Sequence, residues 1–238
     1  YIVTPKSGSS PLDNPIQQIS NTYYGSMSFN GGIILTCAQS GSSCIVYAWN
    51  GAQYYQAYSL SSWSGVTDMN LSPDGVYCCL IGYVAAQLYK KSNGNYNYPG
   101  SSITNDGNSY SRCDMSNNRL VYAGGSRVRI LNKNSAANFV DAQTFTVSSS
   151  ISSIKISYFN NWLFVGTHGN QLFVYIYSGS SYTHYETLGF EAYIADIDVS
   201  YDTKTLLIGV YKSKFYIYGF HCTLIPHCIS CSTGTFCD

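Results

Sequence analysis

Apolar and polar residues alternate along most of this 238-residue chain, in short runs separated by turn-forming residues. Five runs share one pattern, in which two apolar residues two positions apart enclose a polar or small residue. These pairs are Met27/Phe29, Met69/Leu71, Cys113/Met115, Ile154/Ile156 and Ile197/Val199. Side chains two positions apart lie on the same face of a strand, so the pattern predicts five strands with one apolar face each. No run repeats its apolar residues at the spacing of a helix.

A further apolar or aromatic residue precedes each pair. These residues lie five positions before the second member of the pair: Tyr24, Val66, Tyr110, Ile151 and Ile194. An odd separation would put them on the opposite face of a regular strand. We therefore expect a small irregularity at the start of these strands.

A turn rich in Asn, Asp, Gly, Ser and Pro follows each first strand, and a second apolar strand comes after it. Four of the second strands end at glycines that are 42, 42 and 43 residues apart: Gly82, Gly124, Gly166 and Gly209. A third strand, rich in aromatic and β-branched residues, and a weaker fourth strand complete each repeat. Four strands repeated at this period predict the blades of a β-propeller.

The expected fold is therefore all-β, a propeller of about five visible four-stranded blades, complete or part of a larger ring. We predict that it extends over residues 1–221, with repeats anchored near residues 29, 71, 115, 156 and 199. Residues 1–23 have two interpretations: a closing strand for the last blade, or the end of a preceding blade. Closure is preferred, because the last blade ends at KFYIYGF without an evident fourth strand.

The segment LSPDG at Leu71–Gly75 resembles the WD-repeat propeller family, as do the pairs in which serine follows the anchor. Those pairs are Leu71-Ser72, Met115-Ser116, Ile156-Ser157 and Val199-Ser200. The resemblance covers five units from about Tyr24 to Phe220 and implies the blade fold. No Gly-His dipeptide opens a repeat and no Trp-Asp dipeptide closes one. The family's buried network of His, Asp, Ser and Trp is therefore not carried over, and no functional residue is.

Only 10% of the residues are charged, and the formal net charge is zero. A nucleic-acid partner is excluded, because it requires a basic surface to displace counterions. Tyrosine is abundant, with 24 residues. Most are expected to pack between blades, and the remainder, with Ser, Gly and Asn in the loops, make an adhesive surface. No apolar run is long enough to span a membrane.

Nine cysteines in a polar chain of low charge indicate an oxidising compartment, so we expect an extracellular or cell-surface protein. Cys37 and Cys44 flank a six-residue turn and are predicted to form a disulfide. Cys78 and Cys79 are adjacent on a strand and face opposite sides. Cys113 is placed to meet either of them, and the alternative is that all three are buried thiols acting as small apolar residues.

The last residues, 222–238, are predicted to form a separate cysteine-rich disulfide tail. Its cysteines are Cys222, Cys228, Cys231 and Cys237. A zinc site formed with His221 and His227 is the alternative. The segment CISCSTGTFCD resembles the start of furin-like or growth-factor-receptor cysteine-rich repeats, as in protist surface proteins.

No motif for catalysis, phosphate binding or calcium binding is present, so we expect no catalytic residue, cofactor or metal. His168 is predicted to be a polar turn residue and His184 to be exposed. Asp198 aligns with Ser28, Asn70, Asp114 and Lys155, which indicates a mixed polar channel and not a ring of acids. Asn70-Leu71-Ser72 makes Asn70 a candidate N-glycosylation site.

These features favour a non-catalytic extracellular structural or interaction protein. Its expected partners are copies of itself, in filaments or a matrix, other extracellular proteins, and glycans. Two alternatives stay open. One is a propeller enzyme of the lactonase or lyase type, and the other is a cytosolic WD-like scaffold.

Overall fold

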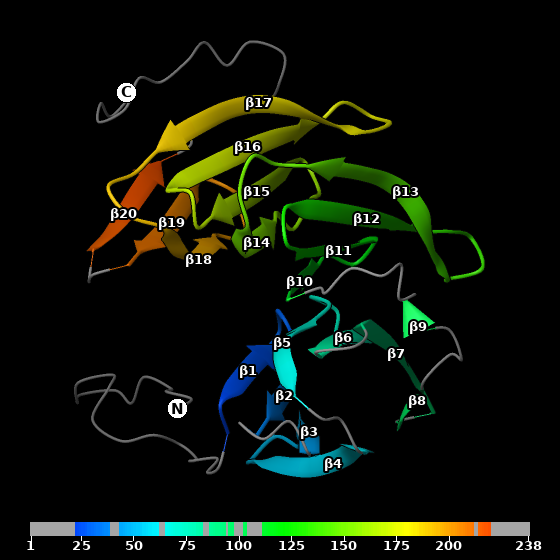
Figure 1. The fold of residues 1–238 in the computed structure, drawn as a ribbon. Helices are drawn as coiled ribbons and strands as arrows, with labels where there is room; N and C mark the ends of the chain where they lie inside the picture. Colours follow the sequence, from blue (N-terminus) through cyan, green and yellow to red (C-terminus); the bar gives the residue numbers. More distant parts are fainter. Residues whose placement is uncertain are drawn as a thin grey trace. The chain divides into compact units, whose positions relative to one another are not determined.

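The computed structural model describes residues 22–38, 43–61, 65–82, 86–93, 95–97, 102–103, 111–211 and 214–219. The regular secondary structure in these ranges consists of β-strands alone, and every pair of neighbouring strands is antiparallel (Figure 1). The chain divides into two compact units, Tyr1–Gly107 and Asn108–Asp238. The predicted all-β class is confirmed.

The first unit contains two sheets, which we call blades 1 and 2. Blade 1 consists of β1 (Tyr24–Met27), β2 (Ile33–Cys37), β3 (Ser43–Trp49) and β4 (Tyr54–Ser61), in that order. Blade 2 consists of β5 (Val66–Leu71), β6 (Tyr77–Gly82), β7 (Ala86–Ser92) and β8 (Asn95–Asn97). The short β9 (Ser102–Ile103) also pairs with β7.

The second unit contains blades 3, 4 and 5. Blade 3 consists of β10 (Arg112–Met115), β11 (Arg119–Gly124), β12 (Arg127–Lys133) and β13 (Phe139–Thr146). Blade 4 consists of β14 (Ile151–Ile156), β15 (Trp162–Thr167), β16 (Gln171–Tyr177) and β17 (Tyr182–Gly189). Blade 5 has three strands in the described residues: β18 (Ile194–Val199), β19 (Thr205–Val210) and β20 (Lys214–Gly219).

Consecutive strands are neighbours in every sheet, which is the up-and-down order of a propeller blade. The first strands β10, β14 and β18 follow one another side by side in the second unit, and β1 lies beside β5 in the first (Figure 1). This confirms the propeller of four-stranded blades predicted from the repeats. The described residues include only 22 and 23 of the predicted closing segment, residues 1–23, and none of the predicted cysteine-rich tail, residues 222–238, so both domain boundaries stay predictions.

The hydrophobic core lies between consecutive blades. We call the face that a blade turns to the next blade in the chain its forward face, and the opposite one its backward face. The forward face of blade 4 presents Phe164, Leu172 and Val174, which pack against Ile194 and Leu206 of blade 5. All of these side chains are buried. Blades 3 and 4, and blades 1 and 2, are joined in the same way.

One serine organises the turn after each first strand. These serines are Ser28, Ser72, Ser116, Ser157 and Ser200. In each turn the serine N–H donates to the carbonyl of the residue near the start of the second strand, and the N–H of that residue donates back to the serine Oγ. The return bonds measure 2.8–3.0 Å, from Ile33, Tyr77, Arg119, Trp162 and Thr205. The five serines therefore set the true register of the repeats.

This register corrects the predicted alignment of the first repeat. Ser28 is equivalent to Ser72, so the residue before it, Met27, takes the place assigned to Phe29. Both Met27 and Phe29 are exposed, whereas Leu71 and Ile156, which precede the serines of blades 2 and 4, are buried. Side chains alternate with period two, so a slip of two residues keeps every side chain on its face and leaves no mark in the apolar pattern.

The irregularity predicted at the start of the first strands is confirmed in three blades. The pairing register shifts between Val66 and Asp68, between Ile151 and Ser153, and between Ile194 and Asp196. Each shift turns the leading apolar residue back into the core. Tyr110 lies outside the described residues, and Tyr24 pairs with Cys37 without a shift.

The periodic glycines share no single register. Gly166 and Gly209 pair with Ser153 and Asp196, which occupy equivalent positions, whereas Gly82 lies one position further along its strand. At Gly166 a Cβ would lie 2.5 Å from Ile194 Cγ2 and 2.7 Å from its Cβ. The packing of the next blade therefore requires a glycine at that position.

Tyrosines on the outer strands of three blades form hydrogen bonds to the serine turns. Tyr54, Tyr96 and Tyr182 each donate their hydroxyl to the carbonyl of the third residue after a turn serine. The acceptors are Gly31, Gly75 and Asn160, and all three have positive φ angles, of 68°, 67° and 62°. The outermost strand of a blade is thus tied to the turn between its two innermost strands.

In blade 4 the hydrogen bond from the Tyr182 hydroxyl to the Asn160 carbonyl measures 2.7 Å, and an arginine of blade 3 donates to the same groups. Arg119 donates through Nη1 to the Asn160 carbonyl at 3.0 Å and to the Tyr182 hydroxyl at 3.2 Å. Its guanidinium carbon lies 3.5 Å from the centre of the Tyr177 ring. Burial raises the pKa of Tyr182 to about 12, so its hydroxyl stays a donor at neutral pH.

We expect Tyr182→Phe to lower the free energy of unfolding by about 1–2 kcal/mol, because the Asn160 carbonyl loses one of its two donors and Arg119 loses one of its acceptors. Tyr185→Phe is the matched control, since Tyr185 is exposed on the same strand. That variant should change stability by less than about 0.5 kcal/mol. Urea denaturation measures both, and equal effects would contradict the structural role of the Tyr182 hydroxyl.

Candidate interaction surfaces

Polar side chains lie at one equivalent position on the first strands of the five blades. They occupy the position two residues before the turn serine: Ser26, Asn70, Asp114, Lys155 and Asp198. Ser26 Oγ donates to Asn70 Oδ1 at 3.0 Å and accepts from the Leu71 N–H at 3.0 Å. In the second unit Asp114 Oδ2 accepts the equivalent bond from the Ile156 N–H at 2.8 Å. The first repeat contributes Ser26, not Ser28 as its predicted alignment required.

Lys155 lies between two carboxylates. Its Nζ is 3.1 Å from Asp198 Oδ1 and 3.9 Å from Asp114 Oδ1. Attraction by Asp114 raises the pKa of Lys155. Burial raises the pKa of Asp114, and Lys155 partly offsets that effect. In the second unit, the line from Asp114 through Lys155 to Asp198 is therefore mixed in charge, with one lysine between two carboxylates.

Three aromatic rings gather at the serine turns of blades 4 and 5, and we call them the turn-face aromatic cluster. The ring centres of Tyr158 and Tyr201 are 4.4 Å apart, and the Phe159 ring lies 5.0 Å from Tyr158 and 5.4 Å from Tyr201. Phe159 is 52% exposed and Tyr201 44%. Asn117 of the blade 3 turn donates to the Tyr158 hydroxyl at 3.5 Å. Turns of three consecutive blades thus meet at this surface.

A second aromatic group lies at the opposite ends of the same strands. Tyr193 and Tyr211 stack with ring centres 4.6 Å apart and an interplanar angle of 17°. The His168 ring lies 4.9 Å from Tyr193. His168 is an exposed residue of the β15–β16 turn, the place predicted for it. His184 is exposed on β17, and its Nε2 lies 2.8 Å from Thr187 Oγ1.

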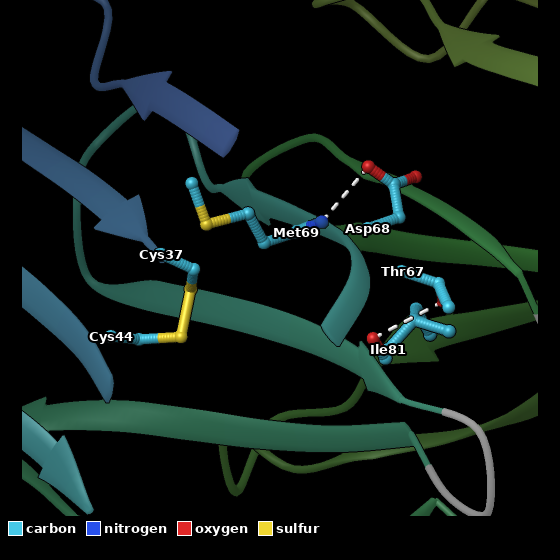
Figure 2. Close-up of a disulfide and its surroundings, with 6 residues drawn as sticks. All are labelled: Cys37, Cys44, Thr67, Asp68, Met69 and Ile81. Atoms are coloured by element: carbon cyan, nitrogen blue, oxygen red, sulfur yellow. Dashed lines mark hydrogen bonds between the residues drawn. A yellow bond between two sulfur atoms is a disulfide. The ribbon is translucent and has the colours of Figure 1, made fainter. Parts of the chain in front are cut away.

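Cys37 and Cys44 form a disulfide across β2 and β3, which Figure 2 shows beside the first strand of blade 2. Their Cα atoms are 4.1 Å apart. Both residues are buried in the core between blades 1 and 2, near Met69. Closing a loop of this length removes chain entropy from the unfolded state worth about 2.5 kcal/mol.

The other described cysteines, Cys78, Cys79 and Cys113, are buried thiols. Burial raises the pKa of the Cys78 thiol well above its usual value, and Cys79 adds to the effect. The Cys78 thiol is therefore protonated and a poor nucleophile. Cys222, Cys228, Cys231 and Cys237 lie outside the described residues, so the disulfide tail and its zinc alternative stay predictions.

Asn70 is half-buried on β5, where its amide oxygen accepts the Ser26 bond. Ser72, the third residue of its glycosylation sequon, is buried in the turn. A glycan at Asn70 would have to displace the contact between β1 and β5. Modification of Asn70 stays a prediction.

Within the described ranges, no group of three or more His, Cys, Asp and Glu side chains is placed to hold a metal ion. The same ranges contain no helix with the length and apolar character needed to cross a membrane.

Sequence reasoning missed the turn-face aromatic cluster and the tyrosine bonds to the turns. A signal for the cluster exists, because Tyr158 and Tyr201 both directly follow a turn serine. The hydrogen bonds from the outer tyrosines to the turns are harder to predict from the sequence, because the outer strands vary in length and in their distance from the turn along the chain.

Two of the solved structures that are similar to this chain show what it resembles. One is the crystal structure of a functionally unknown protein from Desulfotomaculum acetoxidans DSM 771, with a TM-score of 0.69 and 14% identity. The other is a chain in a crystal structure of the mitotic checkpoint complex, with a TM-score of 0.68 and 16% identity. Both matches cover 84% of this chain, which spans 66% and 62% of the length of those chains.

At these identities the similarity shows the fold alone, an all-β propeller. No protein-family model and no curated protein sequence matches the chain.

We expect Lys155→Met to lower the free energy of unfolding by about 3 kcal/mol, because Asp114 becomes an uncompensated buried charge. Asp198→Asn, at the exposed end of the same line, should cost less than about 1 kcal/mol. Urea denaturation of the two variants measures the difference.

The pH dependence gives the control. A carboxyl whose pKa is raised in the folded state binds its proton more tightly there, so acidification favours folding. Lys155→Met should therefore recover part of its lost stability between about pH 7 and about pH 5, relative to the unsubstituted protein. A loss that is the same at both pH values would contradict the charge explanation.

Proposed function

We propose that this chain is a non-catalytic contact module, a propeller that binds another protein through its turn-face aromatic cluster. One observation carries the proposal: Tyr158, Phe159 and Tyr201 form an exposed aromatic surface built from two adjacent blades. Aromatic residues are enriched at the energetic centres of protein interfaces.

The position of the cluster supports this role. Its rings lie on short turns that the serine bonds hold, so little conformational entropy is lost when a partner covers them. The Tyr158 and Tyr201 hydroxyls add polar groups that orient a partner. A chain of similar fold occurs in the mitotic checkpoint complex, an assembly of several proteins, which supports a contact role by analogy of fold alone.

The absence of catalysis is part of the proposal. The best-defined group of charges, Lys155 with Asp114 and Asp198, is paired within itself on the first strands. The alternative is an enzyme of the lactonase or lyase type. Metal-dependent hydrolysis of a lactone by the purified chain would favour that alternative.

We also propose that the protein works outside the cell or on its surface. Nine cysteines and the disulfide between Cys37 and Cys44 support this, because disulfides persist in oxidising compartments. A cysteine-rich tail of the furin-like type at residues 222–238 belongs to the same proposal. Glycans are the second class of partner in such an environment.

Alkylation of the protein taken from its source, before any reduction, tests the compartment. We expect Cys37 and Cys44 to stay unmodified and to react only after reduction. Mass spectrometry of the peptides reads each position. Alkylation of all nine cysteines without reduction would favour the cytosolic scaffold instead.

An array of extracellular proteins and glycans, probed with the unreduced chain, tests the contact surface. We expect Phe159→Ala combined with Tyr201→Ala to weaken protein binding at least tenfold, because a hot-spot aromatic contributes about 2 kcal/mol or more. Tyr185→Ala removes an exposed aromatic residue away from the cluster and should bind like the unsubstituted protein. Binding that the double substitution leaves unchanged would exclude this surface.

A further inference from the structure

A stacked pair of tyrosines lies at the strand ends of blade 5 that are opposite the serine turns. Tyr193 directly precedes β18, and Tyr211 directly follows β19. Their ring centres are 4.6 Å apart, and the ring planes differ by 17°. Tyr193 covers one face of the Tyr211 ring, yet Tyr211 is still 51% exposed. The pair therefore offers a flat aromatic surface to solvent.

The backbone holds this pair in place. Ile194 and Val210 are paired across β18 and β19, and the Tyr211 N–H donates to the Tyr193 carbonyl at 3.0 Å. The two tyrosines thus continue the ladder of a hairpin by one step. A surface ordered in advance loses little conformational entropy when a ligand covers it.

Two loops of blade 4 are joined to the pair. The His168 ring lies 4.9 Å from the Tyr193 ring. The His168 N–H donates to the Ser150 carbonyl, and the Phe190 N–H donates to the Asn170 carbonyl, both at 2.8 Å. These bonds connect the loop before β14, the β15–β16 turn and the loop before β18 into one surface.

The side chains that flank the rings are polar. His168 and Ser148 are exposed, and Ser148 Oγ donates to Gln171 Oε1 at 3.0 Å. A Cβ at Gly169 would lie 2.8 Å from the Cβ of Ser149, so the glycine lets this serine approach the turn. Imidazole, hydroxyl and amide groups therefore surround the aromatic pair.

The described part of this surface carries no strong charge. Residues 147–150, 167–171 and 192–193 contain no Asp, Glu, Lys or Arg. The neighbouring Glu191 is paired with Lys214, whose Nζ lies 2.9 Å from Glu191 Oε1. A ligand that matches the surface presents an apolar face together with uncharged hydrogen-bonding groups.

A sugar ring has this combination. Its C–H hydrogens are weakly positive because each carbon bears oxygen, so they are attracted to the negative face of an aromatic ring. Its hydroxyl groups both donate and accept, as do the imidazole, hydroxyl and amide groups beside the tyrosines.

We propose that the surface formed by Tyr193, Tyr211 and His168 binds a carbohydrate. A pyranose ring stacks on Tyr211, and its hydroxyl groups exchange hydrogen bonds with His168 and the adjacent loops. The inference rests on the proposed function only for glycans as a class of partner, and it gives them a site separate from the turn-face aromatic cluster.

Isothermal titration of the full chain with soluble neutral oligosaccharides tests the proposal. The probes are oligosaccharides of glucose, N-acetylglucosamine, mannose and galactose, each up to about 10 mM. We expect at least one of them to bind with a Kd of about 1 mM or below. No binding by any of the four sugars would overturn the proposal.

Substitutions then locate the binding. Tyr211→Ala should weaken it at least about tenfold, because the ring that stacks on the sugar is lost. Tyr211→Phe keeps the ring and should keep most of the affinity. Tyr185→Ala, which removes an exposed aromatic residue of β17, is the matched control and should bind like the unsubstituted protein. Equal losses in Tyr211→Ala and Tyr211→Phe would overturn the stacked contact.

His168→Ala is the second variant, and it keeps the test valid if Tyr211→Ala does not fold. It should also weaken sugar binding, since the sugar loses a hydrogen-bonding partner. Sugar binding that neither Tyr211→Ala nor His168→Ala changes would place the site elsewhere and overturn the proposal. Loss of a protein partner in these variants, with no sugar bound, would make this surface a second protein contact instead.

The two proposals fail separately. Phe159→Ala combined with Tyr201→Ala leaves the Tyr193–Tyr211 pair intact, so it should bind the sugar like the unsubstituted protein. Sugar binding that persists while the array shows no protein partner rejects only the turn-face contact. Protein binding through the turn-face aromatic cluster, with no sugar bound, rejects only the carbohydrate site.

Discussion

Face-to-face packing of consecutive sheets is the interaction on which the rest of this structure depends. A β-sheet with two apolar faces is stable only when both are covered, so each blade requires the next. Phe164 and Leu172 are fully buried solely because blade 5 lies on them. The same requirement excludes a side chain at Gly166, where Ile194 fills the space.

Polar bonds fix the spacing that this packing needs. The turn serines close the first hairpin of every blade, and the outer tyrosines tie the last strand of three blades to that turn. Here hydroxyl groups suffice, since each satisfies a backbone group that the packed blades would leave buried. The abundance of tyrosine thus has a structural cause beyond apolar packing.

The line from Asp114 through Lys155 to Asp198 shows how the first strands tolerate charge. A buried carboxylate is costly, and Asp114 is stabilised by Lys155 and by the Ile156 N–H. Lys155 thus stabilises the negative charge on the first strands. The exposed rings of Phe159 and Tyr201 lie at the strand ends, on the serine turns.

The sequence by itself determined the all-β class, the repeat and the strand irregularities at Val66, Ile151 and Ile194, because all of these follow from local alternation of side chains. It misplaced the first repeat by two residues, since alternation is blind to a slip of one full period. Only the tertiary structure decided that Ser28 is the turn serine of the first repeat and that Ser26 is its counterpart of Asn70. Hydrogen bonds between strands define both positions. The tertiary structure also decided the exposure of Phe215 and Ile217. The sequence pattern around them is that of a buried strand, but their burial depends on which sheet lies beside them.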